Sequence, residues 1–187
     1  SGNDHIITQV DRDGNGVFDL KTDDNTTVSV GYRTQVVQDF ANNGTLLDKT
    51  TIVKNDDGRT RNTQIDRNGD GKNDQTDVIT IDGSGISTDT LSDFVSGEMT
   101  DQVITTTLAN GLSITTTTDE DGDSVYETKV TDNTVITAGV STTETVTTTN
   151  KDGTARNWKT ITTTADGLEI TTASDFNGDS FADLTTT

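Results

Sequence analysis

The chain is organised around the stretch Asp66-Arg67-Asn68-Gly69-Asp70-Gly71-Lys72-Asn73-Asp74. The same nine-residue pattern occurs three more times, at residues 11–19, 119–127 and 175–183. All four copies follow the rule D-x-[DN]-G-[DN]-[GS]-x-x-[DE], so oxygen-bearing side chains stand at positions one, three, five and nine. A calcium ion takes about six to eight oxygen ligands, and a short loop whose alternate residues point inward can supply several of them. We therefore expect four calcium-binding loops, numbered loop 1 to loop 4 along the chain.

The expected ligands are the side chains at positions one, three, five and nine and the main-chain carbonyl at position seven. Position seven varies because only its carbonyl would face the metal, and the small residue at position six permits a sharp turn. One Asp-Gly turn alone could be a solvated acidic turn, but such a turn does not need an acid at position nine. The expected ligands are Asp11, Asp13, Asn15, Val17, Asp19; Asp66, Asn68, Asp70, Lys72, Asp74; Asp119, Asp121, Asp123, Val125, Glu127; and Asp175, Asn177, Asp179, Phe181, Asp183.

The composition limits both the core and the partners of the chain. Of 187 residues only 40 are Leu, Ile, Val or Phe, and the net charge is −19. So little apolar surface cannot easily offset a backbone entropy cost of roughly 1–2 kcal/mol per residue, and bound cations would help. The 13 basic residues form no cluster of the kind that binds nucleic acid or anionic membranes. No apolar run is long enough for a membrane span, and Cys and Pro are absent.

Internal repeats divide the chain. The loops begin 55, 53 and 56 residues apart, and the glycine pairs 44/58, 97/111 and 153/167 are each separated by 14 residues. Fixed glycine spacing indicates turns at fixed places. We expect residues 1–10 to end a preceding repeat, residues 11–65, 66–118 and 119–174 to form three repeats, and residues 175–187 to begin a fourth, as in a piece of a longer array.

The segments between the turns are typical of β-strands. Thr, Val and Ile predominate, and these β-branched residues favour extended structure. No amphipathic helical pattern is found, and hairpin turns are expected at residues 42–44, 57–58, 110–111 and 166–167. The predicted fold is all-β: an elongated, open array of antiparallel β-hairpin repeats, with about four strands in each repeat of roughly 54 residues and calcium-binding loops between repeats.

The loop pattern resembles the calcium loops of thrombospondin type 3 repeats, of integrin-like propellers and of dockerins. Asp77 takes the twelfth place of a dockerin loop, but Thr22, Val130 and Thr186 stand there in the other copies. Over the whole chain, the Asp-Gly hairpins, the Thr runs such as residues 162–164 and the D-x-[DN]-G-D loops resemble the repetitive regions of large secreted bacterial proteins of the RTX and type I secreted adhesin kind. This resemblance implies secretion and calcium binding. The glycine-rich nonapeptide of the RTX β-roll is absent, so the resemblance does not imply that fold.

The sequence favours a structural function over catalysis. We expect a calcium-binding spacer or adhesin stalk in a large secreted, extracellular or cell-surface protein, which folds and stiffens on binding about four Ca²⁺ ions. Its partners would be calcium, neighbouring repeats of the same chain and a cell-surface glycan, without nucleic acid or membrane insertion. No enzyme activity is expected, because the regularly spaced acids are accounted for by the loops and the single histidine, His5, has no evident catalytic partner.

Two alternatives remain open. Thr-rich strand faces, with candidates at residues 115–118 and 147–149, could bind a glycan or ice, with Trp158 as a sugar platform. Thr that merely pairs across strands would explain the same composition. A more distant alternative is a fragment of a β-rich polysaccharide-active enzyme with paired carboxylates.

Overall fold

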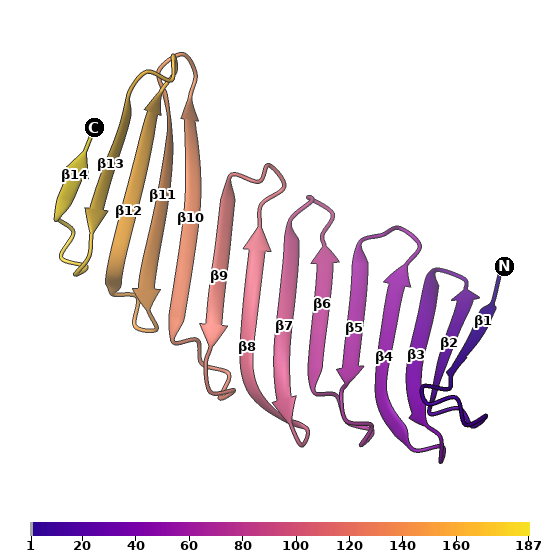
Figure 1. Cartoon of the computed structure of the whole chain (residues 1–187). Coiled ribbons are helices and arrows are strands. Elements are labelled where there is room, and N and C mark those ends of the chain that lie inside the picture. Colours follow the sequence, from indigo (N-terminus) through magenta and orange to yellow (C-terminus); the bar gives the residue numbers. More distant parts are fainter. Residues whose placement is uncertain (1) are drawn as a thin grey trace. The chain divides into compact units, whose positions relative to one another are not determined.

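The fold is an antiparallel β-sheet built from consecutive strands. The computed structural model describes residues 2–187, and in this range it contains fourteen strands and no helix (Figure 1). The order of the strands in the sheet is their order in the chain, from β1 to β14. Every strand therefore pairs with its chain neighbours, as hairpin connections require. The predicted all-β array of antiparallel hairpins is confirmed.

Four strands separate each loop from the next. The strands are β1 (Asp4–Val10), β2 (Leu20–Ser29), β3 (Tyr32–Ala41), β4 (Leu46–Asn55), β5 (Thr60–Asp66), β6 (Gln75–Ile81), β7 (Ser87–Val95), β8 (Glu98–Thr107), β9 (Ser113–Asp119), β10 (Thr128–Thr137), β11 (Ser141–Asn150), β12 (Ala155–Thr164), β13 (Ile170–Asp175) and β14 (Leu184–Thr186). Loop 1 joins β1 to β2, loop 2 joins β5 to β6, loop 3 joins β9 to β10, and loop 4 joins β13 to β14. The expected number of strands in each repeat is thus confirmed.

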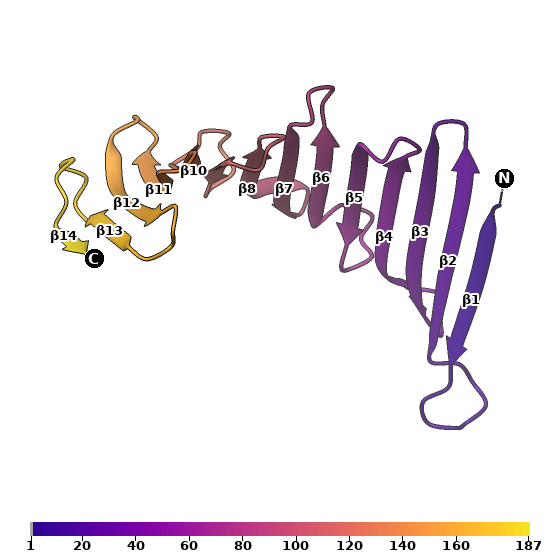
Figure 2. The same cartoon turned by 90° about the horizontal axis from the view of Figure 1, so that it is seen from above.

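The chain divides into two compact units. Unit 1 consists of the residues up to Asp82 together with Asp89–Thr100, and it contains loops 1 and 2. Unit 2 consists of Gly83–Thr88 and Asp101–Thr187, and it contains loops 3 and 4. In unit 1, strands β1 to β5 lie side by side in a single layer (Figure 2). In unit 2, strands β9 to β14 are joined by the same antiparallel pairing.

The hairpin turns use glycine in one repeated way. In the turn after β3, the Gly44 N–H donates to the Ala41 carbonyl at 2.9 Å, and Gly44 has a positive φ of 84°. This is a tight turn followed by a left-handed residue, which only glycine adopts without strain. The turns at Gly58, Gly111, Gly153 and Gly167 carry the same hydrogen bond. The turns expected from the sequence at residues 42–44, 57–58, 110–111 and 166–167 are confirmed.

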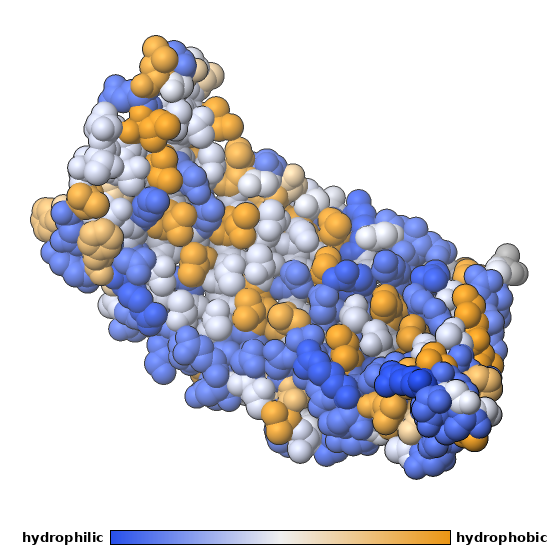
Figure 3. All heavy atoms as spheres, viewed as in Figure 1, coloured by the Kyte–Doolittle hydropathy of each residue, from blue (hydrophilic) through white to orange (hydrophobic). Residues whose placement is uncertain are grey.

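The sheet has no apolar core. Among residues 2–187 no hydrophobic side chain is buried, and Figure 3 shows apolar side chains in small separate groups among polar ones. A single layer leaves both faces accessible to water, so burial contributes little. Cross-strand pairs contribute instead, each roughly 0.2–1 kcal/mol. In unit 2 several of them join threonine hydroxyls, as in Thr143–Thr162 at 3.2 Å and Thr105–Thr116 at 3.3 Å.

One charged cluster lies within the sheet of unit 1. Arg61 of β5 donates from its guanidinium to Asp77 of β6, and Asp89 of β7 shares a hydrogen bond with Asp77. Burial raises the pKa of Asp89 above its usual value, and the charge and hydrogen bond of Asp77 raise it further, against a smaller opposing effect of Arg61. One cation thus serves two carboxylates, and the second carboxylate loses its proton at a higher pH than an ordinary aspartate.

We predict that Asp89→Asn raises the free energy of unfolding at pH 7. A carboxyl whose pKa is raised by folding stabilises the fold below about pH 4, its unfolded pKa, and this stabilisation is lost as the pH rises through the folded pKa. An amide keeps a hydrogen bond to Asp77 without the charge. Urea unfolding of the variant and the parent protein between pH 3 and about pH 7, in saturating calcium, measures the difference.

The control is Asp4→Asn, which removes the same charge from the exposed strand β1. In this variant the free energy of unfolding should change between pH 4 and about pH 7 by the same amount as in the parent protein. If Asp89→Asn lowers the free energy of unfolding at neutral pH, the assignment of Asp89 as a destabilising charge is wrong.

Candidate metal centre

The four loops occupy equivalent places in the sheet. Strands β1 and β5 run in the same direction because four antiparallel pairings separate them, and loops 1 and 2 therefore lie at the same edge of unit 1 (Figure 1). The same argument places loops 3 and 4 at one edge of unit 2, after β9 and β13. In loops 2, 3 and 4 the residue at position one is the last residue of a strand. Its carboxylate therefore starts from a rigid position in the ladder.

The carboxylate at position one is held by the main chain of its own loop. In loop 2 one oxygen of Asp66 accepts the N–H of Gly69 at 2.7 Å, and the other accepts the N–H of Gly71 at 2.9 Å. The equivalent pair of hydrogen bonds, from positions four and six, is present in loops 1, 3 and 4. Asp66 is 4% exposed, and Asp119 and Asp175 are 0% exposed. Burial of an ionised group is costly unless such donors surround it.

The acid at position nine closes each loop into a ring. In loop 1 the Asp19 carboxylate accepts the N–H of Arg12 at 2.7 Å, while the Asp19 N–H donates to the Val10 carbonyl at 2.8 Å. Both bonds recur in the other three loops, with Glu127 in this role in loop 3. The residues on the two sides of the loop are thereby held together at the sheet edge. This explains why the ninth position is acidic in every copy.

Positions three and five bend the loop in successive steps. In loop 4 the side-chain oxygen of Asn177 accepts the N–H of Asp179 at 2.9 Å, and that of Asp179 accepts the N–H of Phe181 at 2.9 Å. Loops 1, 2 and 3 repeat both bonds. A short Asp or Asn side chain that accepts an N–H two residues later forms a local turn. Each candidate ligand side chain at positions three and five therefore has one fixed main-chain partner and further lone pairs that remain available.

In loops 2 and 4, glycine is required at position four for a second reason besides its backbone angle. In loop 2, Gly69 has a φ of +71°, and a Cβ atom there would lie 2.2 Å from the Leu46 carbonyl oxygen. In loop 4 a Cβ atom on Gly178 would lie 2.2 Å from the Ala155 carbonyl oxygen. Both contacts are with the main chain at the start of a strand, β4 or β12. The loop thus packs directly on the preceding hairpin, and only glycine allows this approach.

Three carboxylates converge in loops 1 and 3. Oxygens of Asp11, Asp13 and Asp19 lie within 4.8 Å of one another, and so do those of Asp119, Asp121 and Glu127. In loops 2 and 4, position three is Asn, and in the described chain no group of three carboxylates is brought together there. The amides instead donate to carboxylates, from Asn68 to Asp74 at 3.4 Å and from Asn177 to Asp179 at 3.3 Å. All four loops therefore gather oxygens, and two of them gather three acidic groups.

The position-one carboxylates of loops 1, 2 and 4 favour their charged forms. The N–H of Gly16 lowers the pKa of Asp11 most, and its effect together with the other loop hydrogen bonds exceeds the opposing effect of burial. For Asp66 and Asp175, burial is the largest single effect and raises the pKa. The hydrogen bonds from the loop N–H groups together exceed it, so the pKa of both is lowered. These groups are anionic at neutral pH and suited to binding a hard cation.

The structure places three side chains beside the loops that the sequence did not assign to them. Each stands directly across the ladder from the carboxylate at position one: Lys49 opposite Asp66, Gln102 opposite Asp119, and Trp158 opposite Asp175. The hydrogen bond from the side chain of Trp158 helps to lower the pKa of Asp175. All three residue types can donate a hydrogen bond. Only the register of the strands could have identified them.

Two features named from the sequence, the carbonyls at position seven and His5, are not part of the loop hydrogen bonds described above. The main-chain carbonyls of Val17, Lys72, Val125 and Phe181 remain predicted ligands, since the structure fixes only the hydrogen bonds of their N–H groups. His5 lies exposed on β1, where its Nε2 is 2.7 Å from the Asp23 carboxylate.

No helix that could cross a membrane is present among residues 2–187. Comparison of the chain with protein-family models, with curated proteins and with solved structures found no match.

We predict that Gly69→Ala destabilises the protein more than Gly71→Ala does. Both glycines have positive φ, +71° and +84°, so alanine at either place costs about 1–2 kcal/mol of backbone strain. Only Gly69 faces a neighbouring carbonyl; the space around Gly71 is open. Equilibrium urea unfolding in saturating calcium measures both. Equal losses would show that loop 2 does not pack on the start of β4.

Proposed function

We propose that the four loops bind calcium and that the chain is a structural repeat segment of a large extracellular protein. The observation that carries the proposal concerns counter-ions. Positions one, three, five and nine of the loops carry thirteen carboxylates, and among residues 2–187 none of them forms an ion pair; the pairs present are His5–Asp23, Lys21–Asp23 and Arg61–Asp77. Ionised groups in so small a volume repel one another unless a cation joins them. Calcium is the cation whose preference for oxygen ligands fits these groups.

The absence of an apolar core supports a role for calcium in folding. A domain has a stability of about 5–15 kcal/mol, and here no hydrophobic side chain of the described chain is buried. A site at 100 times its dissociation constant adds about 2.7 kcal/mol to the folded state. Four such sites are comparable to the whole stability of a domain. A segment of this kind is expected to be largely unfolded in low calcium and to stiffen in the millimolar calcium found outside cells.

Trp158 offers a test that is specific to one loop. It is the single tryptophan, and its side chain is hydrogen-bonded to Asp175 of loop 4. We predict that its fluorescence changes on addition of calcium, and that Asp179→Asn shifts this titration to about tenfold higher calcium concentration. Asp70→Asn in loop 2 is the matched control and should leave the Trp158 titration in place.

Isothermal titration of the same proteins counts the sites. About four are expected in the parent protein, with one weakened in each variant. If calcium addition produced neither a heat of binding nor a change in Trp158 fluorescence, the proposed function would be contradicted. A response of Trp158 that shifts equally in both variants would mean that the loops do not act as separate sites.

The choice of metal gives a second test. Magnesium requires a smaller octahedron and releases its water reluctantly, and zinc prefers nitrogen and sulfur ligands that these loops lack. We predict that millimolar calcium, but neither magnesium nor zinc, restores the β-sheet circular dichroism of protein prepared in chelator. If magnesium restores it equally well, the loops are not calcium sites.

A further inference from the structure

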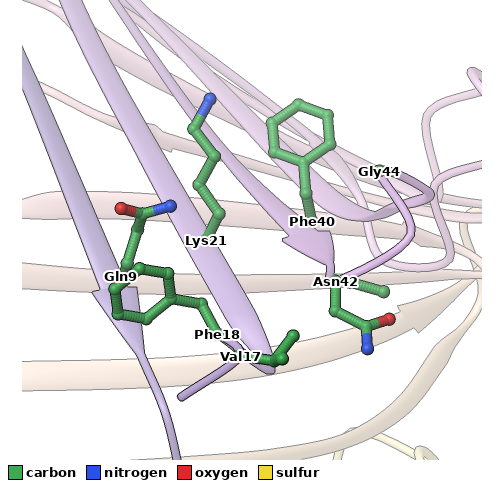
Figure 4. A pocket seen from close by; sticks show the side chains of 8 residues that line it. Gln9, Val17, Phe18, Lys21, Phe40, Asn42 and Gly44 are labelled. Atoms are coloured by element: carbon green, nitrogen blue, oxygen red, sulfur yellow. The ribbon is translucent and has the colours of Figure 1, made fainter.

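The same groove occurs once in each compact unit. The groove of unit 1 has a volume of about 490 Å³ and is lined by Val17, Phe18, Lys21, Phe40 and Gly44, among others (Figure 4). The groove of unit 2 has a volume of about 580 Å³, and its corresponding lining residues are Val125, Tyr126, Lys129, Thr149 and Gly153. Both volumes lie in the usual range for small-molecule sites, about 300–1,000 Å³.

The corresponding lining residues of the two grooves stand at equivalent places in their repeats. Val and an aromatic residue fill positions seven and eight of the loop, and Lys is the second residue of the next strand. The loop ends where β2 or β10 begins, and the hairpin turn after β3 or β11 lies at the same end, because Leu20 pairs with Ala41 and Thr128 with Asn150. The loop and the turn thus form two walls above a floor of strand residues.

In the repeat that begins with loop 2, side chains fill the place where the other two repeats have a groove. Position seven of loop 2 is Lys72, whose Nζ donates to the Ser96 carbonyl at 2.6 Å. The hairpin there is a two-residue turn, and a Cβ atom on Gly97 would lie only 3.3 Å from the Lys72 side chain. The long Lys72 side chain therefore reaches the short turn and closes the space that remains open beside Val17 and Val125 in the other two repeats. The sequence thus distinguishes open repeats from a bridged one.

The chemistry of the grooves differs from that of the chain as a whole. With 32 acidic residues in the chain, neither groove is lined by any Asp or Glu. In unit 2, Lys129 and Lys151 line the groove, and within residues 2–187 neither forms an ion pair. In unit 1, Lys21 lies over the Phe40 ring, 5.4 Å from its centre, and pairs with Asp23. The unit 2 groove therefore offers two uncompensated cations to an anionic ligand.

The aromatic wall of the unit 2 groove is preorganised. The Tyr126 hydroxyl donates to Gln102 at 3.1 Å, which fixes the orientation of its ring. A fixed aromatic ring presents an apolar face without the entropy cost of ordering it on binding. The hydroxyls of Thr117 and Ser124 stand beside it in the lining. A ring face, hydroxyls and ammonium groups together suit a ligand that has an apolar face, hydroxyl groups and a carboxylate.

We propose that these grooves bind carboxylated sugar units of an acidic polysaccharide, most tightly in unit 2. The sugar ring lies against Tyr126, and its carboxylate is bound by Lys129 and Lys151. Charge complementarity selects this ligand over a neutral saccharide, and screening within about 8 Å at physiological salt limits repulsion from the acidic remainder of the chain. The proposal requires a folded chain but does not depend on which cation fills the loops.

The test is an NMR titration of the whole 187-residue chain in saturating calcium with trigalacturonate, and with the neutral galactotriose as comparison. Trigalacturonate is expected to shift the amide signals of Tyr126 and Lys129 and to bind at least about tenfold more tightly than galactotriose. Lys129→Gln should weaken its binding about tenfold, the loss of one charge-assisted hydrogen bond, and Tyr126→Ala should weaken it as well. Lys54→Gln, outside both grooves, should leave binding unchanged.

Circular dichroism and the calcium titration of each variant separate loss of the groove from loss of the fold. Equal binding of galactotriose would overturn the assignment of a carboxylated ligand. Absence of shifts with trigalacturonate, in protein that still binds calcium, would overturn the groove itself. A doubled mass in sedimentation that Tyr126→Ala abolishes would assign the groove to a second copy of this chain instead.

Discussion

The carboxylate at position one of each loop, which is buried in loops 2, 3 and 4, is the constraint on which the rest of the structure depends. Asp119 and Asp175 are fully buried, yet they are surrounded by main-chain N–H groups and not by cationic side chains. Their position at the end of a strand fixes the start of the loop, and the acid at position nine fixes its end. Ring closure in turn sets where the next strand begins, and so joins one group of four strands to the next. A cation at the centre would offset the repulsion that these acids generate.

A sheet of this kind has few other sources of stability. It buries no apolar side chain in the described chain; its buried groups, such as Thr26 and Ser92, are polar, and the Arg61–Asp77–Asp89 cluster is only half-buried. Ladder hydrogen bonds and threonine pairs exchange for bonds to water and yield modest net energies, about 0.5–1.5 kcal/mol each. The threonine hydroxyls that bond across β11 and β12 fit this structural role. Stability that comes mainly from local pairs, with bound ions as the proposed supplement, would suit the proposed segment that unfolds in low calcium and folds in high calcium.

Much of the fold could be predicted from the sequence, because its determinants are local. The β-branched runs, the glycine turns at 44, 58, 111, 153 and 167, and the loop rule are each specified within a few residues. The features that could not be predicted depend on register. Trp158 meets Asp175, and the groove wall of Tyr126 meets Gln102, only because particular residues face one another across strands. The bridging of one groove by Lys72 likewise follows from a turn two residues long. The ligand role of the position-seven carbonyls, the metal and the extracellular setting stay predictions.

The most direct measurement of the central claim is thermal unfolding, followed by far-ultraviolet circular dichroism, in excess chelator and in millimolar calcium. For a chain of this size, 1 kcal/mol shifts the melting temperature by about 2–4 °C, and each occupied site adds about 2.7 kcal/mol at 100 times its dissociation constant. The account predicts a largely unfolded chain in chelator and a cooperative transition in calcium, displaced upward by on the order of 20 °C or more. A melting temperature that is the same in chelator and in calcium would contradict it.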